Sequence, residues 1–175
     1  QNAYYTFGQL GSTTVASISN FYKHPNVLQV LNVSVDTHSF LRTNLGIPDS
    51  ALSRIINSIE PIFVPDTNKQ NIFTWMPRKN PDHVNAVLNS LQLSSFSYPQ
   101  PWKALPLSNL THSEVADNLN SSRIFLSFGH PEGFGLPIAE AMCSGCWVVG
   151  YSGGGGRELF NHGGSNHIPF GDWSA

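Results

Sequence analysis

The feature that most constrains the fold is a regular alternation of strand-like and helix-like segments that begins near residue 70. Short apolar runs at 71–75, 123–128 and 146–151 are each followed by a segment that reads as a helix. Strands and helices that alternate in this way form parallel sheets, because each crossover helix returns the chain to the same edge. We therefore predict an α/β fold, with a Rossmann-like parallel sheet and helices on both faces.

Capping signals mark two of the helix starts. Asn80 and Pro81 supply an N-cap and a first-turn proline, and apolar residues then recur at helical spacing through residue 91. Thr111 and Glu114 fit a capping box. A further helix is expected at about 137–144, after a glycine-rich turn.

The first 70 residues are less regular. Residues 1–26 show no clear period, whereas residues 27–35 alternate apolar and polar side chains and predict a strand. Helices are expected at 36–45 and at 50–59. The prolines and polar residues of 61–68 indicate a linker.

Composition excludes several function classes. A net charge of −2 with scattered Lys and Arg argues against a nucleic-acid binder that works by neutralising phosphates. Hydrophobic residues make up 40% of the chain, which is ample for a buried core. No apolar run approaches the roughly 18 residues that span a bilayer, and the first residues lack the build of a signal peptide. We expect a cytoplasmic location.

Cys143 and Cys146 form a lone Cys-x-x-Cys. A structural zinc site would need two more ligands at suitable spacing, and a redox pair normally opens a helix rather than following one. We interpret both cysteines as packing residues in a reducing compartment, with redox or metal chemistry as the minor alternative. His130, beside Pro131, is interpreted as a residue that shapes the turn.

The segment 127–150 carries the densest chemical signal. Glu132 stands in a glycine-rich loop, and Glu140 stands one turn inside the helix that follows. A helix N-terminus after a glycine loop attracts anions, because backbone N–H groups and the helix dipole point there. The two carboxylates can hold ribose and sugar hydroxyls. The combination fits a phosphate-bearing sugar derivative.

This segment resembles the Glu-x7-Glu motif of the retaining glycosyltransferases of family 4, which have the two-domain GT-B architecture. The resemblance rests on Glu-Gly-Phe-Gly-Leu-Pro from Glu132, on Glu-Ala-Met from Glu140, and on Ser-Gly-Cys-x-Val-Val-Gly that ends at Gly150. Pro77-Arg78-Lys79 resembles the family's basic loop, and 154–158 its later Gly-Gly element. Residues 45–65 resemble the passage through the hinge.

The resemblance implies a domain organisation. The chain would comprise the C-terminal half of a GT-B fold together with the end of the preceding domain. Residues 1–64 would be the tail of the N-terminal acceptor domain and the hinge. Residues 65–175 would be the nucleotide-sugar-binding domain, truncated at its C-terminus.

The resemblance also implies roles for individual residues. Glu132 would contact the transferred sugar near the reacting carbon, while Arg78 and Lys79 would stabilise the leaving diphosphate; these three are the expected catalytic residues. Glu140 would hold the ribose. The donor would further contact the glycine loops, at Gly133, Phe134, Gly135, Leu136 and Gly155, and its base would lie against Leu107 and Asn109.

The sequence departs from the family pattern in two places. Phe73 and Thr74 stand where the family usually carries an Arg before the basic loop, which leaves Arg78 and Lys79 for the diphosphate. Trp147 replaces the usual proline after Ser-Gly-Cys.

The implied reaction transfers a sugar from a nucleoside diphosphate sugar to an acceptor hydroxyl, with retention of configuration and without a metal or cofactor. The acceptor would be a glycan or a lipid-linked sugar, and peripheral membrane contact would involve the N-terminal domain. The main alternative is a nucleotide-sugar-binding module without turnover.

Two other activities fit less well. A dinucleotide-dependent oxidoreductase would need Gly-x-Gly-x-x-Gly, but position 138 is Ile. Phosphorylase-like chemistry would need a pyridoxal phosphate lysine, which no motif marks.

Overall fold

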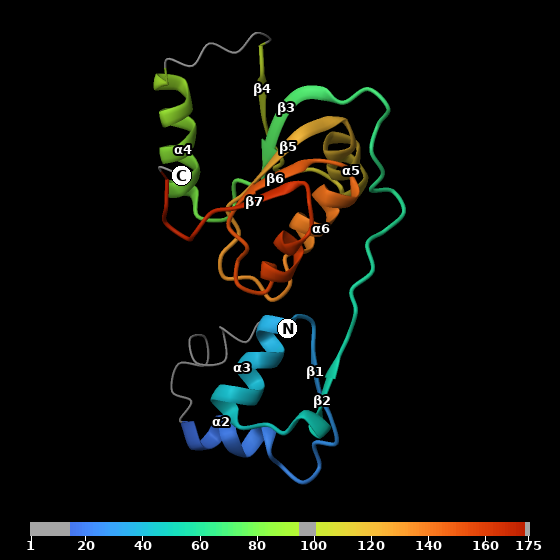
Figure 1. The fold of residues 1–175 in the computed structure, drawn as a ribbon, viewed down its shortest axis with the longest axis vertical. Helices are drawn as coiled ribbons and strands as arrows, with labels where there is room; N and C mark the ends of the chain where they lie inside the picture. Colours follow the sequence, from blue (N-terminus) through green and yellow to red (C-terminus); the bar gives the residue numbers. More distant parts are fainter. Residues whose placement is uncertain (1–14, 95–100, 174–175) are drawn as a thin grey trace.

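The computed structural model describes residues 15–94 and 101–173, which form two lobes joined by the extended segment 55–69 (Figure 1). The small lobe contains α2 (Val15–Tyr22), β1 (Val30–Asn32), α3 (Val35–Leu45), the 3-10 helix η1 (Asp49–Ala51) and β2 (Leu52–Arg54). The large lobe contains β3 (Gln70–Trp75), α4 (Pro81–Leu93), β4 (Lys103–Pro106), α5 (His112–Ser121), β5 (Ser122–Ser127), α6 (Leu136–Cys143), β6 (Trp147–Gly150), the 3-10 helix η2 (Arg157–Asn161) and β7 (Ser165–His167).

The large lobe is built on a parallel sheet of five strands in the order β4-β3-β5-β6-β7. Helix α4 covers one face over a cluster formed by Trp75, Val84, Phe128 and Tyr151. Helices α5 and α6 cover the other face over a larger cluster that includes Leu119, Phe125, Ile138, Ala141 and Val148. The prediction of an α/β fold with helices on both faces of a parallel sheet is confirmed.

The predicted helix starts are also found, with one difference in how they are capped. Thr111 and Glu114 form the reciprocal capping box of α5. Asn80 precedes α4, but its backbone is left-handed (φ 46°) and its side chain does not cap the helix. Its Nδ2 donates instead to the carbonyls of Phe128, at 2.7 Å, and His130, at 3.3 Å. Asn80 therefore ties the start of α4 to the loop after β5.

The expected helix at 50–59 is wrong. Its first residues form η1 and β2, and the chain then runs extended into the linker. Leu52 pairs with Val30 in a parallel two-stranded sheet, so tertiary pairing decides the local structure. The isoleucines of this segment also favour extended backbone, because branching at Cβ crowds a helix. The strand expected at 27–35 is shorter, since Val35 already begins α3.

Three further elements were not expected from the sequence. Strand β4 follows a proline-rich stretch, β7 has the polar sequence Ser-Asn-His, and α2 lies where no period is visible. The rest of the aromatic N-terminal stretch, residues 1–14, lies outside the described residues.

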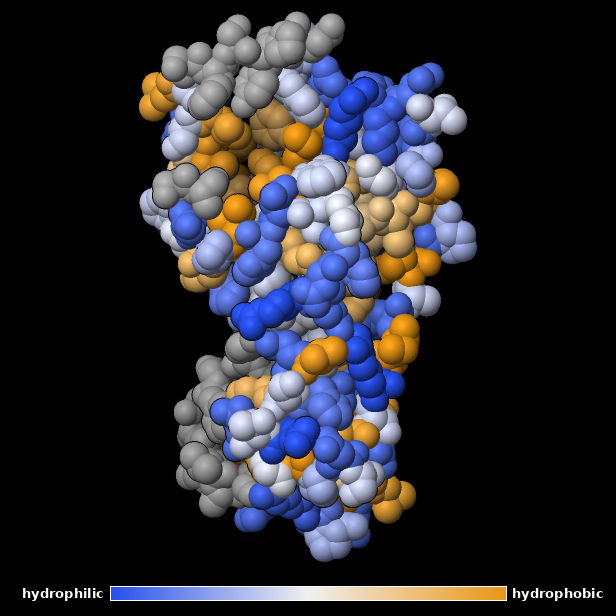
Figure 2. Space-filling model, viewed as in Figure 1, coloured by the Kyte–Doolittle hydropathy of each residue, from blue (hydrophilic) through white to orange (hydrophobic). Residues whose placement is uncertain are grey.

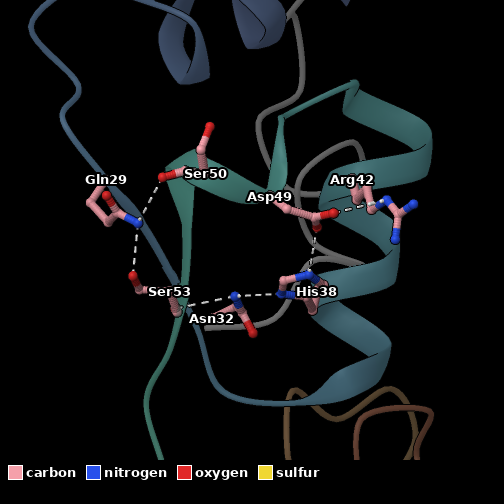
Figure 3. Close-up of polar contacts among 7 residues, drawn as sticks. All are labelled: Gln29, Asn32, His38, Arg42, Asp49, Ser50 and Ser53. Carbon is pink, nitrogen blue, oxygen red and sulfur yellow. Dashed lines mark hydrogen bonds and ion pairs between the residues drawn. The ribbon is translucent and has the colours of Figure 1, made fainter.

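The small lobe has its own buried hydrophobic cluster, formed by Ile18, Val30, Leu41, Leu45, Ile47 and Leu52, and a polar network joins its elements β1, α3, η1 and β2 (Figure 3). His38 joins two of these elements, because its Nε2 lies 3.1 Å from Oδ1 of Asp49 and its Nδ1 lies 3.3 Å from Nδ2 of Asn32. Asn32 also donates to the carbonyl of Ser53 at 3.2 Å. Arg42 adds an ion pair to Asp49 at 3.6 Å. These contacts fix α3 against the two-stranded sheet.

Among the described residues, an ion pair and a hydrogen bond join the lobes on the side of the glycine loops. Arg54, at the end of β2, forms an ion pair with Glu158 of η2 at 2.6 Å. Thr37 of α3 donates through its hydroxyl to the carbonyl of Gly133 at 3.5 Å. The small lobe therefore lies against the edge of the large sheet where the loops gather.

The two cysteines differ in environment. Cys146 is buried, and its thiol donates to the carbonyls of Leu119 at 3.2 Å and Ser122 at 3.3 Å. Burial raises the pKa of the Cys146 thiol, and nearby Lys69 opposes that shift. Cys143 is exposed at the end of α6. The interpretation as a packing residue holds for Cys146 but not for Cys143.

Hydrophobic side chains also gather in a hollow between α4 and the sheet (Figure 2). This hollow has a volume of about 480 Å³, and its lining includes Phe73, Leu88, Leu91, Trp102 and Ile124. Within the described ranges, the helices are all too short or too polar to cross a membrane.

Candidate ligand-binding site

The carboxyl ends of three parallel strands meet at one edge of the large sheet. Residues 76–80 follow β3, residues 128–135 follow β5, and residues 151–156 follow β6. Ligands in open parallel sheets bind at this edge, because the loops there converge while helix N-termini point toward them. The predicted catalytic residues come from the first two of these loops.

The glycine loops after β5 and β6 are bound to each other through Glu132. Its backbone N–H donates to the carbonyl of Gly153 at 2.8 Å, and its own carbonyl accepts from the N–H of Gly155 at 3.1 Å. A Cβ on Gly155 would lie 2.1 Å from the carbonyl oxygen of Gly133, which no side chain tolerates. Only glycine therefore permits the close approach of the two loops that fixes Glu132.

Lys79 and Glu132 form an ion pair across the site. The Nζ atom of Lys79 lies 3.1 Å from Oε1 of Glu132, and both side chains are partly buried, at 31% and 23% exposure. Asn80, the next residue, holds the same loop to the end of β5. Two predicted catalytic residues are thus brought together.

Helix α6 begins at the same place. Gly135 precedes it with φ 90°, and the first turn contains Pro137, which has no N–H to lose. The N–H groups of Ile138 and Ala139 donate to the carbonyl of Gly135, at 3.0 Å and 3.2 Å, and the helix dipole makes this end positive. The loop residues Gly133 and Phe134 lead into it.

A pocket of about 480 Å³ joins these parts. It is within the 300–1,000 Å³ typical of small-molecule sites. Its lining contains most of the predicted site residues: Arg78, Lys79, Glu132, Gly133, Phe134, Gly135, Leu136 and Glu140.

Three predicted contact residues do not line this pocket. Leu107 is buried in the large core cluster, and its N–H donates to the carbonyl of Trp75 at 2.8 Å. Asn109 lies on the surface with left-handed backbone (φ 56°). Gly155 is buried, and its N–H is used by Glu132. The structure gives Gly155 a packing role, and any contact of a ligand with Leu107 or Asn109 stays a prediction.

Glu140 occupies the most distinctive electrostatic environment of the pocket. Burial raises the pKa of its carboxyl above the ordinary value. His112 opposes this shift, whereas Glu60 adds to it. A partly desolvated carboxylate in a pocket is well suited to accept hydrogen bonds from hydroxyl groups of a ligand.

Sequence reasoning missed several residues of the pocket. His112, the first residue of α5, lines it beside Glu140, and the small lobe contributes Val33, with Asn57 from the joining segment. His112 follows β4, so recognition of that strand would have placed His112 at the same sheet edge as the other loops. Nothing in the sequence marks Val33 or Asn57.

His130 has a role in the turn, as predicted. Its ring stacks on Phe170, with centroids 4.2 Å apart, and its carbonyl accepts from Asn80. Burial lowers the pKa of the His130 imidazole, and Glu132 opposes that shift. Across residues 15–94 and 101–173, no group of three or more His, Cys, Asp or Glu side chains is placed to hold a metal ion.

Comparison with known proteins gives this site a context. Residues 104–175 match the family model of the glycosyl transferases group 1. Both glutamates, both glycine loops and α6 lie within the matched residues, while Arg78 and Lys79 lie before them. A segment of 61 residues is 41% identical to an alpha-1,6-glucosyltransferase of Actinobacillus pleuropneumoniae serotype 7 (strain AP76), covering 35% of this chain and 18% of that protein.

The fold is also found in a solved structure. The crystal structure of a glycosyltransferase from Rickettsia africae ESF-5 superposes with a TM-score of 0.70 at 16% identity. The superposition covers 93% of this chain and 55% of that protein. Likeness at this identity shows a shared fold. The chain thus spans little more than half of one relative and matches a smaller part of the other.

Proposed function

We propose that this chain binds a nucleoside diphosphate sugar in the pocket at the sheet edge and belongs to a glycosyltransferase that acts with retention. The observation that carries the proposal is that one pocket contains two carboxylates, two cationic side chains and the N-terminus of α6. The match of residues 104–175 to the glycosyl transferases group 1 supports the same activity.

The cationic and the acidic side chains of the pocket would have different roles. Arg78 and Lys79, together with the N-terminus of α6, supply fixed positive potential for a diphosphate. Fixed donors of this kind lower the barrier to glycosidic cleavage, because negative charge grows on the leaving diphosphate in the transition state. We propose that they serve this role without a metal ion or cofactor. Glu132, paired with Lys79, is then next to the reacting sugar, and Glu140 holds the ribose.

Titration calorimetry of UDP, GDP, ADP and their sugars into the 175-residue chain tests donor binding. We expect saturable binding of one nucleotide, and loss of that binding in Glu140→Ala. Asp117→Asn, an exposed residue of α5 outside the pocket, is a control that should bind as the parent chain does. A folded parent chain that binds none of these ligands would refute the proposal.

Turnover is tested separately. Hydrolysis or transfer of the sugar from the nucleotide that binds, measured with and without EDTA, reports both activity and metal dependence. We expect EDTA to have no effect, and the anomeric configuration of the product, read by NMR, to be retained.

A binding module without turnover is the second candidate. Phe73 and Thr74 favour it, because they place no cation at the end of β3: Phe73 packs on Trp75, and the buried Thr74 hydroxyl donates to the carbonyl of Leu105 at 2.6 Å. Tight binding without hydrolysis or transfer would support this candidate. An acceptor glycan or lipid-linked sugar, membrane contact, a cytoplasmic location and the domain division after residue 64 remain predictions.

A further inference from the structure

Asn80 joins the two loops that carry Lys79 and Glu132. It follows Lys79 directly and precedes α4, in the loop after β3. Its Nδ2 donates to the carbonyls of Phe128, at 2.7 Å, and His130, at 3.3 Å, in the loop after β5 that leads to Glu132. The proposed function leaves this half-buried side chain without a role.

The backbone of Asn80 explains which residue types fit this position. It is left-handed, with φ 46° and ψ 59°, a conformation that glycine adopts at least cost and that asparagine tolerates. An asparagine before a helix ordinarily accepts a hydrogen bond from a first-turn N–H through its side chain. Here only the backbone carbonyl does so, from His83 at 3.0 Å and Val84 at 3.1 Å. The start of α4 thus needs the backbone of Asn80, while the side chain serves the other loop.

Two bridges therefore cross between the loops, and a bound anion would affect them differently. The first is the ion pair of Lys79 and Glu132, 3.1 Å between Nζ and Oε1. A diphosphate competes with Glu132 for Lys79, because both are anions that pair with an ammonium group. The second bridge is the pair of Asn80 bonds, which join neutral groups. The arrival of an anion at Lys79 leaves this second bridge in place.

We propose that Asn80 is a positioning residue for Lys79, which holds that ammonium group at the pocket when a nucleoside diphosphate takes the place of Glu132. This inference rests on the proposed function, since it needs an anionic ligand at Lys79. Lys79 lines the pocket and Asn80 does not, so Asn80 acts through its neighbour. A lysine side chain is flexible, so a fixed backbone beside it reduces the cost of ordering the ammonium group on binding.

The test compares binding of UDP, GDP and ADP to the parent chain, Asn80→Gly, Lys79→Ala and the double variant, by calorimetry. Glycine keeps the left-handed backbone and removes only the side chain, so the fold should be retained. For the nucleotide that binds, we expect Asn80→Gly to weaken affinity about threefold to tenfold. In the Lys79→Ala background the same substitution should cause little further loss. Asn85→Ala, an exposed asparagine of α4 outside the pocket, is the matched control.

Two further measurements distinguish positioning of Lys79 from a general loosening of the fold. The matching nucleoside, which lacks the diphosphate, should bind Asn80→Gly as well as it binds the parent chain, by NMR titration. Hydrogen exchange of the unliganded chains, read by mass spectrometry, should be faster at residues 76–80 and 128–132 in Asn80→Gly and unchanged in α5.

The outcomes separate the two proposals. If the folded parent chain binds no nucleotide, the proposed function fails. If the parent chain binds, but Asn80→Gly matches it in affinity or Lys79→Ala binds undiminished, the positioning role alone is overturned. Equal losses for nucleotide and nucleoside, or a full further loss in the Lys79→Ala background, would also overturn it, because the effect would then not pass through Lys79. Unchanged hydrogen exchange in Asn80→Gly would show that the side chain does not hold the loops together and would overturn it as well.

Discussion

Lys79 and Glu132 lie within ion-pair distance, 3.1 Å between Nζ and Oε1, although they come from loops that follow different strands. The pair neutralises part of the positive potential that a diphosphate would use. A ligand anion must therefore compete with Glu132 for Lys79, or share it.

Lys79 and Glu132 should respond to substitution in opposite ways. Lys79→Ala should weaken nucleoside diphosphate binding about tenfold, or about 1.4 kcal/mol. Glu132→Gln should leave that binding unchanged or tighter, because Lys79 is released, while sugar transfer or hydrolysis is lost. Calorimetry of the nucleotide that binds, with Lys103→Ala as a control outside the pocket, measures the first effect. Equal weakening by both substitutions would contradict this division of roles.

Gly155 should be intolerant of any side chain. A Cβ there would lie 2.1 Å from the carbonyl oxygen of Gly133. Overpacking typically costs about 1–3 kcal/mol, and we expect Gly155→Ala to lower the free energy of unfolding by about 3 kcal/mol or more. Gly163→Ala is the matched control, because its Cβ would meet nothing within 4 Å. Urea denaturation of both variants measures the difference. Equal stability of the two would show that the glycine loops do not need their close approach.

Ionisation of Glu140 should lower the free energy of unfolding of the chain as the pH rises. Its pKa in the folded chain is raised above the ordinary value of 4.5, so the folded state holds a proton that the unfolded state has already released. The stability that the neutral carboxyl of Glu140 contributes is fully present below pH 4.5. It is lost as the pH rises through the raised pKa that Glu140 has in the folded chain. Glu140→Gln, which cannot ionise, should therefore be more stable than the parent chain at pH 7 and similar to it at pH 4.

Urea unfolding of the two chains across this pH range measures the effect of Glu140. A parent chain that gains stability relative to Glu140→Gln as pH rises would contradict the direction of the shift. Loss of nucleotide binding in the same variant would link this cost in stability to function.

The two cysteines should differ sharply in reactivity. Cys143 is exposed, whereas burial raises the pKa of the Cys146 thiol and both of its carbonyl partners lie in the core. Iodoacetamide at pH 8 should modify Cys143 in the folded chain and reach Cys146 only in denaturant. Peptide mass spectrometry of the alkylated protein reads both sites. Rapid modification of both in the folded chain would contradict the burial of Cys146.

Substitution of Cys143 and of Cys146 should also have different effects on stability. Cys146→Ala removes the thiol's hydrogen bonds and buried volume, so it should cost about 1–3 kcal/mol of stability. Cys143→Ser should cost little, because the residue is exposed. Thermal unfolding of the two variants distinguishes these outcomes.

The sequence was most informative where local and tertiary preferences agree. The capping box at Thr111 and the helix after Pro81 are local signals, and the sheet that they flank has the predicted parallel topology. The glycine loops could be interpreted because their composition has a direct steric meaning. Most of the ligand residues, which were assigned from the resemblance to the family's motifs, line one pocket.

The errors arise where pairing across the chain decides the structure. Leu52 lies in a strand because β1 is available to pair with it, which a helical spacing of apolar residues cannot reveal. Leu107 was expected to contact the base; its side chain is buried in the large core cluster, and contact of a ligand with this residue stays a prediction. His112 was recognised only as part of a helix start, since its neighbour Glu140 is distant in sequence.

The ion pair between Arg54 and Glu158 has a mechanical consequence. Glu158 lies in η2, directly after the glycine loop whose Gly155 N–H holds the carbonyl of Glu132. The small lobe is thus attached to the chain segment that sets the position of Glu132. A movement of the lobes that breaks this ion pair would therefore act first on the segment whose backbone is hydrogen-bonded to Glu132.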